Sequence, residues 1–257
     1  MPLYTAEALV LRTYKLAESD LIVVFLTRDR GKKRGVAKSA RQSRKRFGAA
    51  LEPLTHARVA YFEKERRELV SLNYAEPITS PLAAGSAESL TYVSYFAELI
   101  DEWAQESDAD ERLFRLGTSV LQALGAQVSV EPLARYFEYW LLRLQGVYPS
   151  HLACHACGVA LSDGHDAGAY LAIGAAVFTC QHCAPALDRG GDGPGRMLSR
   201  GALAFLAAAR GLTPLEVGDY PLPSGVAREL EGVHRALIAL HLEKTLRSDR
   251  VLREMRR

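Results

Sequence analysis

The stretch DLIVVFLT (Asp20–Thr27) decides how the first part of the chain folds. Its run of β-branched and aliphatic residues is typical of a β-strand. After the short charged turn at residues 28–30 comes GKKRGVA (Gly31–Ala37), a second candidate strand that a glycine opens. These two segments predict consecutive strands of a β-structure.

Three further candidate strands lie on either side of this pair. Thr5–Arg12 precedes it, while Leu51–Phe62 and Glu68–Tyr74 follow it. The alternating charges between the last two, at residues 63–68, look like an ordinary solvated turn. Five short strands in about 75 residues favour the small closed barrel of the OB-fold, although an SH3-like barrel explains the spacing almost as well. We predict an OB-fold domain over residues 1–80.

The apolar pattern changes from a period of two to a period of 3.6 after Pro77 and Pro81. Amphipathic runs at residues 93–103, 113–124, 133–144 and 226–240 predict helices with one apolar face each. The predicted fold class is therefore α+β: the five-stranded barrel is followed by an α-helical domain over residues 81–257. A glycine-rich stretch at residues 188–195 is expected to be a flexible connector.

All four cysteines of the chain fall within thirty residues, as two C-x2-C pairs separated by 22 residues. Two such turns can close a tetrahedron of thiolates around one structural zinc ion, with Cys154, Cys157, Cys180 and Cys183 as ligands. Two disulfides are the alternative, but the reducing environment of the cytosol disfavours them. A zinc-finger-like module is thus predicted as an insertion at about residues 149–187 of the helical domain.

Two histidines leave a variant of this metal site open. His155 and His182 each lie inside a C-x2-C loop, so three cysteines and one histidine could bind the ion. That arrangement would leave one thiol idle beside the metal. We therefore expect both histidines to face solvent.

Positive charge is concentrated in the basic segment, Arg28–Arg46, which holds ten basic residues and one acid. Its charge of +9 leaves −7 for the rest of a chain whose net charge is +2. Such a distribution favours a polyanionic partner, although a solvated loop is the simpler alternative. The candidate phosphate contacts are Lys32, Lys33, Arg34, Lys38, Arg41, Arg44, Lys45 and Arg46.

Enzyme signatures are not found in the sequence. There is no G-x4-G-K-[ST], G-x-S-x-G or H-E-x2-H motif, and the H-x-E match at His241 follows both cysteine pairs instead of preceding them. No apolar run approaches the ~18 residues of a membrane-spanning helix, and the first residues do not read as a signal peptide. A cytoplasmic protein without catalytic activity and without a small-molecule substrate is expected.

Taken together and in this order, several segments resemble the bacterial DNA repair protein family RecO. They are ALVLR (8–12), ESDL (18–21), GKKRGVAK (31–38), RFGAALEPL (46–54), REL (67–69), FE (137–138), GVYP (146–149), the first cysteine pair with Gly158, and LRS (246–248). The resemblance implies a recombination mediator, associated with the nucleoid, that binds single- and double-stranded DNA and anneals complementary strands. It also implies RecR and single-strand-binding protein as partners, with loading of the RecA recombinase as the outcome.

Two other functions fit the residues without the resemblance. One is an RNA-directed OB-fold and zinc-ribbon binding factor, since contacts to the 2′-hydroxyl can set a preference for RNA. The other is a zinc-dependent enzyme that modifies nucleic acid. Composition and spacing by themselves indicate a zinc-containing nucleic-acid-binding protein.

Overall fold

The computed structural model describes residues 2–43, 45–64, 67–84, 87–161, 168–184 and 195–255. The chain divides into two compact units, which are described separately. Unit 1 comprises Met1–Val130 and Leu246–Arg257, and unit 2 comprises Glu131–Thr245. This division rests on compactness, and the boundary at residue 80 stays a prediction.

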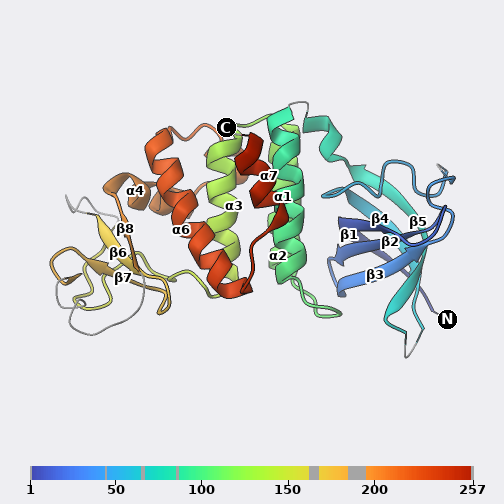
Figure 1. The fold of residues 1–257 in the computed structure, drawn as a ribbon, viewed down its shortest axis with the longest axis horizontal. Coiled ribbons are helices and arrows are strands. Elements are labelled where there is room, and N and C mark those ends of the chain that lie inside the picture. Colours follow the sequence, from blue (N-terminus) through green and yellow to red (C-terminus); the bar gives the residue numbers. More distant parts are fainter. Residues whose placement is uncertain are drawn as a thin grey trace. The chain divides into compact units, whose positions relative to one another are not determined.

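Unit 1 contains the five-stranded barrel (Figure 1). Its strands are β1 (Leu3–Lys15), β2 (Leu21–Thr27), β3 (Gly31–Ala37), β4 (His56–Phe62) and β5 (Leu69–Thr79). They close in the order β1-β2-β3-β5-β4, and only β3 and β5 pair in parallel. The predicted OB-fold barrel is thereby confirmed.

The strand limits differ from the expected ones where pairing is long-range. The fourth strand begins at His56 and not at Leu51, because residues 51–54 form a turn in which Leu54 has a φ of 60°. That turn is held to β1, since the Leu54 N–H donates to the Val10 carbonyl at 2.6 Å. The fifth strand runs beyond Tyr74 to Thr79, and Pro77 lies opposite Ala57 of β4.

Strand β3 pairs with β2 along its whole length, and its other edge has two different neighbours. Its second half, Arg34–Ala37, pairs with β5. In its first half, the Lys32 N–H donates to the Gln105 carbonyl at 3.0 Å, and the Ser107 N–H donates to the Lys32 carbonyl at 3.1 Å. Gly31 has a φ of 68°, and a Cβ there would lie 2.3 Å from the Asp108 carbonyl oxygen. The segment at residues 105–108, which follows the helix Ala87–Trp103, therefore covers the start of β3.

The helices of unit 1 pack on the barrel and on one another. They are the short 3-10 helix η1 (Pro81–Ala84), α1 (Ala87–Trp103), α2 (Glu111–Gly125) and α7 (Arg247–Met255). Gly117 lets α2 approach closely, because a Cβ there would lie 2.6 Å from Leu9 Cδ1 and 2.8 Å from Ile100 Cδ1. Glu98 of α1 accepts a hydrogen bond from the Ser248 N–H at 2.8 Å, which caps the start of α7.

Unit 2 contains the remaining helices and a three-stranded sheet. Its elements are α3 (Val130–Leu144), β6 (Ala169–Ala172), β7 (Val177–Cys180), β8 (Gly195–Leu198), α4 (Arg200–Ala209), α5 (Pro214–Val217) and α6 (Ser224–Leu242). The sheet order is β7-β6-β8. Of the expected connector, residues 188–194 lie outside the described residues, and Gly195 begins β8.

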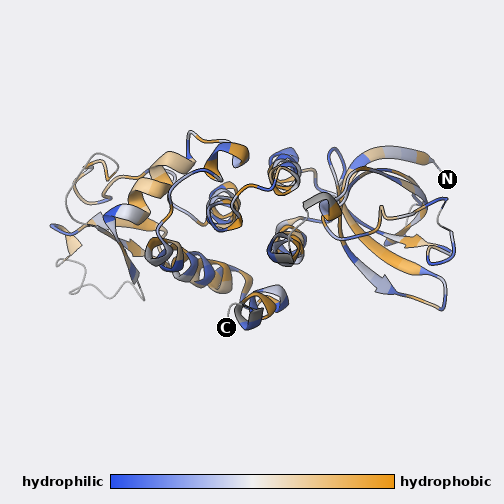
Figure 2. Cartoon of the chain, turned by 90° about the horizontal axis from the view of Figure 1, so that it is seen from above, coloured by the Kyte–Doolittle hydropathy of each residue, from blue (hydrophilic) through white to orange (hydrophobic). Residues whose placement is uncertain are grey.

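The helical runs predicted from the sequence are confirmed as α1, α2, α3 and α6. The helices that Figure 2 shows end-on carry hydrophobic residues on one side and hydrophilic residues on the other. Among the described residues, no helix has the length and apolar character that crossing a membrane requires.

A buried ionic cluster joins α3 to α6 within unit 2. The carboxylate of Glu138 accepts a hydrogen bond from His234 Nδ1 at 2.9 Å and lies 3.0 Å from a guanidinium nitrogen of Arg135. All three side chains are at most 2% exposed. The ring of Tyr148 packs edge-on against the imidazole, with their centroids 5.5 Å apart. Burial lowers the pKa of His234 and outweighs the opposing effect of Glu138.

This cluster predicts how the stability of unit 2 depends on pH. Below a pH of about 6.5 the unfolded chain binds a proton at His234 that the folded chain excludes, so stability falls as the pH falls. The free energy of unfolding should fall more steeply between about pH 7 and about pH 5 in the wild type than in His234→Gln, by up to about 1.4 kcal/mol per pH unit.

The measurement is denaturant unfolding in a Trp103→Phe background, which leaves Trp140 of α3 as the only tryptophan. Its fluorescence then reports on unit 2. Parallel pH curves for the two proteins would show that His234 does not titrate differently in the folded state.

Candidate nucleic-acid interface and metal centre

Six described cations of the basic segment are exposed, and two of them, Arg28 and Arg30, lie within 4 Å of the carboxylates of Glu111 and Asp29. The other four are the candidate contacts. Arg34 points outward from β3, and Lys38, Arg41 and Lys45 lie in the connection between β3 and β4. Among the described residues, none of these four side chains forms an ion pair with an acid. Arg44 lies outside the described residues. The four charges are therefore available to an external anion.

The connection that carries these cations is anchored to the barrel. The Ser39 N–H donates to the Asp20 carboxylate at 2.7 Å, and the Arg41 guanidinium donates to the Glu18 carbonyl at 3.1 Å. Phe47 is 1% exposed and belongs to the barrel core, and the half-buried Arg46 guanidinium lies 4.8 Å above its ring. Arg46 also donates to the Lys38 carbonyl. Anchoring of this kind fixes where the charges lie before any ligand binds.

Lys32 and Lys33 have partners inside unit 1. The Lys32 ammonium donates to the Asp101 carbonyl at 2.5 Å and lies 3.4 Å from the Asp101 carboxylate. Lys33 is 8% exposed, and its ammonium lies 2.7 Å from the Glu63 carboxylate and 3.2 Å from the Ser107 hydroxyl. Both lysines thus tie the covered half of β3 to neighbouring segments, and their charges are already compensated.

This placement predicts that Lys33 contributes to the stability of unit 1 and that Arg34 does not. Lys33→Ala should lower the free energy of unfolding of unit 1 by about 1–3 kcal/mol, because it leaves Glu63 without its partner. Arg34→Ala, at an exposed position of the same strand, should change that free energy by no more than about 0.5 kcal/mol. Denaturant unfolding in a Trp140→Phe background, with Trp103 of α1 as the reporter, measures both. Equal stability of the two variants would contradict the assignment.

Sequence reasoning missed two cations of the turn between β4 and β5. Lys64 and Arg67 are exposed and line a groove of about 640 Å³ together with Lys38. The alternation of acids and bases at residues 63–68 concealed them, because such a pattern is typical of a solvated surface. Only the fold brings them beside Lys38.

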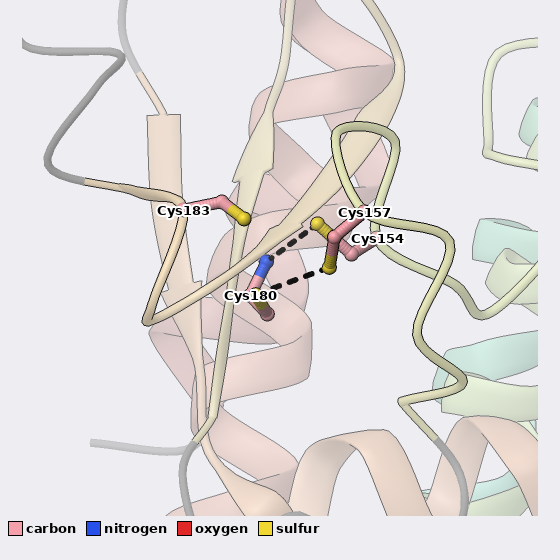
Figure 3. A group of neighbouring side chains, drawn as sticks. All are labelled: Cys154, Cys157, Cys180 and Cys183. Atoms are coloured by element: carbon pink, nitrogen blue, oxygen red, sulfur yellow. Dashed lines mark hydrogen bonds between the residues drawn. The ribbon is translucent and has the colours of Figure 1, made fainter.

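The four cysteine side chains of unit 2 converge on one point (Figure 3). Their sulfur atoms all lie within 4.8 Å of one another, and no disulfide joins them. Cys154 and Cys157 lie on a tight turn that the Gly158 N–H closes by donating to the Cys154 carbonyl at 2.8 Å. Cys180 ends β7, and Cys183 follows on the next turn, where its N–H donates to the Cys180 carbonyl.

The geometry of this cluster fits a tetrahedral metal ion. The sulfurs of Cys157 and Cys180 are 3.8 Å apart. A tetrahedron with Zn–S bonds of about 2.3 Å has edges of about 3.8 Å. Burial raises the pKa of the Cys154 thiol, but backbone N–H groups, first among them that of Cys180, outweigh it and lower the pKa to about 6. A thiolate forms readily there, as metal binding requires.

Neither histidine of the C-x2-C loops belongs to the described cluster of possible metal ligands. His155 and His182 are both exposed, as expected, and the sulfur atoms of all four cysteines complete the set. The arrangement supports a closed site with four sulfur ligands over the variant with a histidine. A closed site of this kind is typical of a structural metal ion.

The comparisons with known proteins agree over nearly the whole chain. The family profile described as "Recombination protein O N terminal" matches residues 1–81, and "Recombination protein O C terminal" matches residues 85–250. The chain is 42% identical over 159 residues to a protein of Koribacter versatilis, which covers 62% of this chain and 65% of that protein.

Two further relatives are matched over almost their full length. A protein of Desulfosudis oleivorans is 29% identical over 100% of this chain and 99% of its own. One of Anaeromyxobacter sp. strain Fw109-5 is 34% identical over 96% of this chain and 94% of its own. All three relatives bear the name "DNA repair protein RecO". On the matches of both family profiles and of these bacterial proteins, the chain belongs to the RecO family of DNA repair proteins.

Proposed function

We propose that the protein is a recombination mediator without catalytic activity, which binds single- and double-stranded DNA and anneals complementary strands. Together with RecR it helps to load RecA onto DNA that single-strand-binding protein covers. Membership of a family of bacterial DNA repair proteins supports this function. Its place of action is the cytoplasm, at the nucleoid.

The observation that carries the proposal is the set of four exposed cations on the OB barrel that have no acidic partner in the part of the chain that the structure describes. Arg34, Lys38, Arg41 and Lys45 can neutralise phosphates without reading sequence, and binding then releases condensed counterions. A strand whose phosphates are neutralised repels its complement less, so two strands can approach and pair. No covalent step is needed for this activity.

The cysteine cluster has a structural part in this proposal. Cys154, Cys157, Cys180 and Cys183 hold one zinc ion per chain, which would cross-link two short turns of unit 2. Because four sulfurs fill the coordination shell, the site leaves no position for a substrate or a catalytic water.

Strand annealing tests the proposal. Two complementary DNA oligonucleotides, one with a fluorophore and one with a quencher, are mixed with and without the protein, in the absence of any nucleotide. The protein should accelerate pairing and leave both strands intact. A tenfold preference for RNA competitors would favour the RNA-directed factor, and cleaved or modified strands would favour the enzyme. Either result would overturn the mediator.

A further inference from the structure

We propose that the cysteine cluster of unit 2 is also an oxidation site, at which a peroxide joins Cys157 to Cys180 as a disulfide and the metal ion is released. The inference rests on the proposed zinc centre and is independent of the DNA-binding function. Exposure, contact between the two sulfurs and a shared pocket all single out this pair among the four cysteines.

Cys157 is the cysteine that solvent reaches most easily. It is exposed, whereas Cys183 is half-buried, and Cys154 and Cys180 are at most 9% exposed. The sulfur of Cys154 also accepts a hydrogen bond from the Cys180 N–H at 3.3 Å, which holds it in the interior of the cluster. Because access controls how fast a thiolate is oxidised, an oxidant reacts first at Cys157.

The sulfur of Cys157 is already in contact with that of Cys180, at 3.8 Å (Figure 3). Cys157 belongs to the first C-x2-C pair and Cys180 to the second. A disulfide between them therefore joins the same two turns that the metal ion would cross-link. A disulfide within either pair, Cys154 with Cys157 or Cys180 with Cys183, would leave the two turns unlinked.

A pocket of about 330 Å³ gives access to the same two cysteines. Its volume is at the lower end of the range of ligand pockets, about 300–1,000 Å³. Of the four cysteines, only Cys157 and Cys180 are among its described lining residues, together with Val159, Leu161, Gly168, Gln181 and His182. A small uncharged peroxide fits such a lining. The pocket thus admits an oxidant to the pair whose sulfurs are in contact.

The reaction consumes two thiolates and one molecule of hydrogen peroxide. The Cys157 thiolate attacks one peroxide oxygen, so that an S–O bond forms, the O–O bond breaks and hydroxide leaves. The Cys180 thiolate then attacks the sulfur of this sulfenic acid, so that the S–S bond forms and a second hydroxide leaves. The two sulfurs lose two electrons, and the peroxide gains them. Only Cys154 and Cys183 then remain as thiolate ligands, which is too few to retain the ion.

Peroxide treatment of freshly purified wild-type protein tests the proposal. A chromophoric chelator reports released zinc, iodoacetamide then blocks the free thiols, and mass spectrometry maps the disulfides. About one zinc ion per chain should be released as the disulfide between Cys157 and Cys180 forms. Because this disulfide still links the two turns, hydrogen exchange in β6 and β7 should stay slower than in reduced protein stripped of metal by the chelator.

Cys157→Ser and Cys183→Ser are a matched pair of variants, since each removes one sulfur of the cluster. Cys183→Ser keeps both reacting sulfurs and should still form the disulfide between Cys157 and Cys180. Cys157→Ser lacks the exposed nucleophile, so its three remaining thiols should be lost more slowly. Equal rates of thiol loss in the two variants would contradict the assignment.

Other products would overturn the proposal. Disulfides within the C-x2-C pairs, or sulfinic acid without a disulfide, would show that Cys157 and Cys180 do not react together. Equally fast hydrogen exchange in oxidised and in metal-stripped protein would show that the disulfide does not replace the cross-link. If fresh protein contains no zinc, the metal centre is wrong, and the disulfide map still decides whether the pair forms. If a variant does not fold, the wild-type map decides alone.

Discussion

Reversing the four exposed cations of the basic segment that form no ion pair among the described residues should abolish DNA binding while the protein stays folded. The variant combines Arg34→Glu, Lys38→Glu, Arg41→Glu and Lys45→Glu. Four lost phosphate contacts, together with the new repulsion, should weaken single-strand binding by roughly a hundredfold or more at moderate salt. Fluorescence anisotropy with a labelled oligonucleotide measures the loss, and annealing should disappear with it.

Lys32 and Lys33 are left out of this variant for a structural reason. Their ammonium groups are compensated by Asp101 and Glu63, so reversing them would place like charges together and destabilise unit 1. A control with four reversed cations elsewhere shows whether net charge alone decides the outcome. It reverses the exposed residues Arg58, Arg112, Arg115 and Arg228. Equal loss of binding in both variants would contradict a localised interface.

Removing two cysteines should empty the metal centre and unfold the segment around it. Cys154→Ser with Cys180→Ser takes one sulfur from each C-x2-C pair, and elemental analysis should fall from about one zinc per chain to nearly none. Structural zinc contributes about 10–16 kcal/mol in zinc-finger peptides, which is comparable with the whole stability of a domain. We therefore expect a large loss of hydrogen-exchange protection in β6 and β7.

The matched control for this variant is His155→Ala with His182→Ala. Both histidines lie inside the cysteine loops and are exposed, so zinc content and protection should stay as in the wild type. Loss of metal in the control would show that a histidine is a ligand after all. No metal in freshly purified wild-type protein would contradict the zinc centre.

The parts of the fold set by local pattern could be predicted from the sequence. Strands β2 and β3 and the helical runs follow from apolar spacing, and the cysteine cluster follows from two short turns that each aim two sulfurs at one point. Strand limits set by distant partners could not. The backbone N–H of Leu54, at the end of the turn before β4, donates a hydrogen bond to the Val10 carbonyl. Nothing in residues 51–55 reveals that partner.

The same reasoning separates the candidate site residues. In the sequence, Arg34 and Lys38 cannot be distinguished from Lys32 and Lys33, because all four are neighbouring positive charges of one segment. Asp101 is 69 residues from Lys32 along the chain, and Glu63 is 30 residues from Lys33, so only the fold reveals that the two lysines are compensated. The cations added by the turn after β4 likewise depend on how the barrel closes.

The central claim is that the exposed cations of the basic segment bind DNA phosphates. Its most direct test is the affinity of the wild type for a single-stranded oligonucleotide, measured over a series of salt concentrations. The account predicts that log affinity falls linearly with log salt, with a slope of about −2.8 or steeper for four or more phosphates at about 0.7 each. Affinity that does not change with salt, or no binding at low salt, would contradict it.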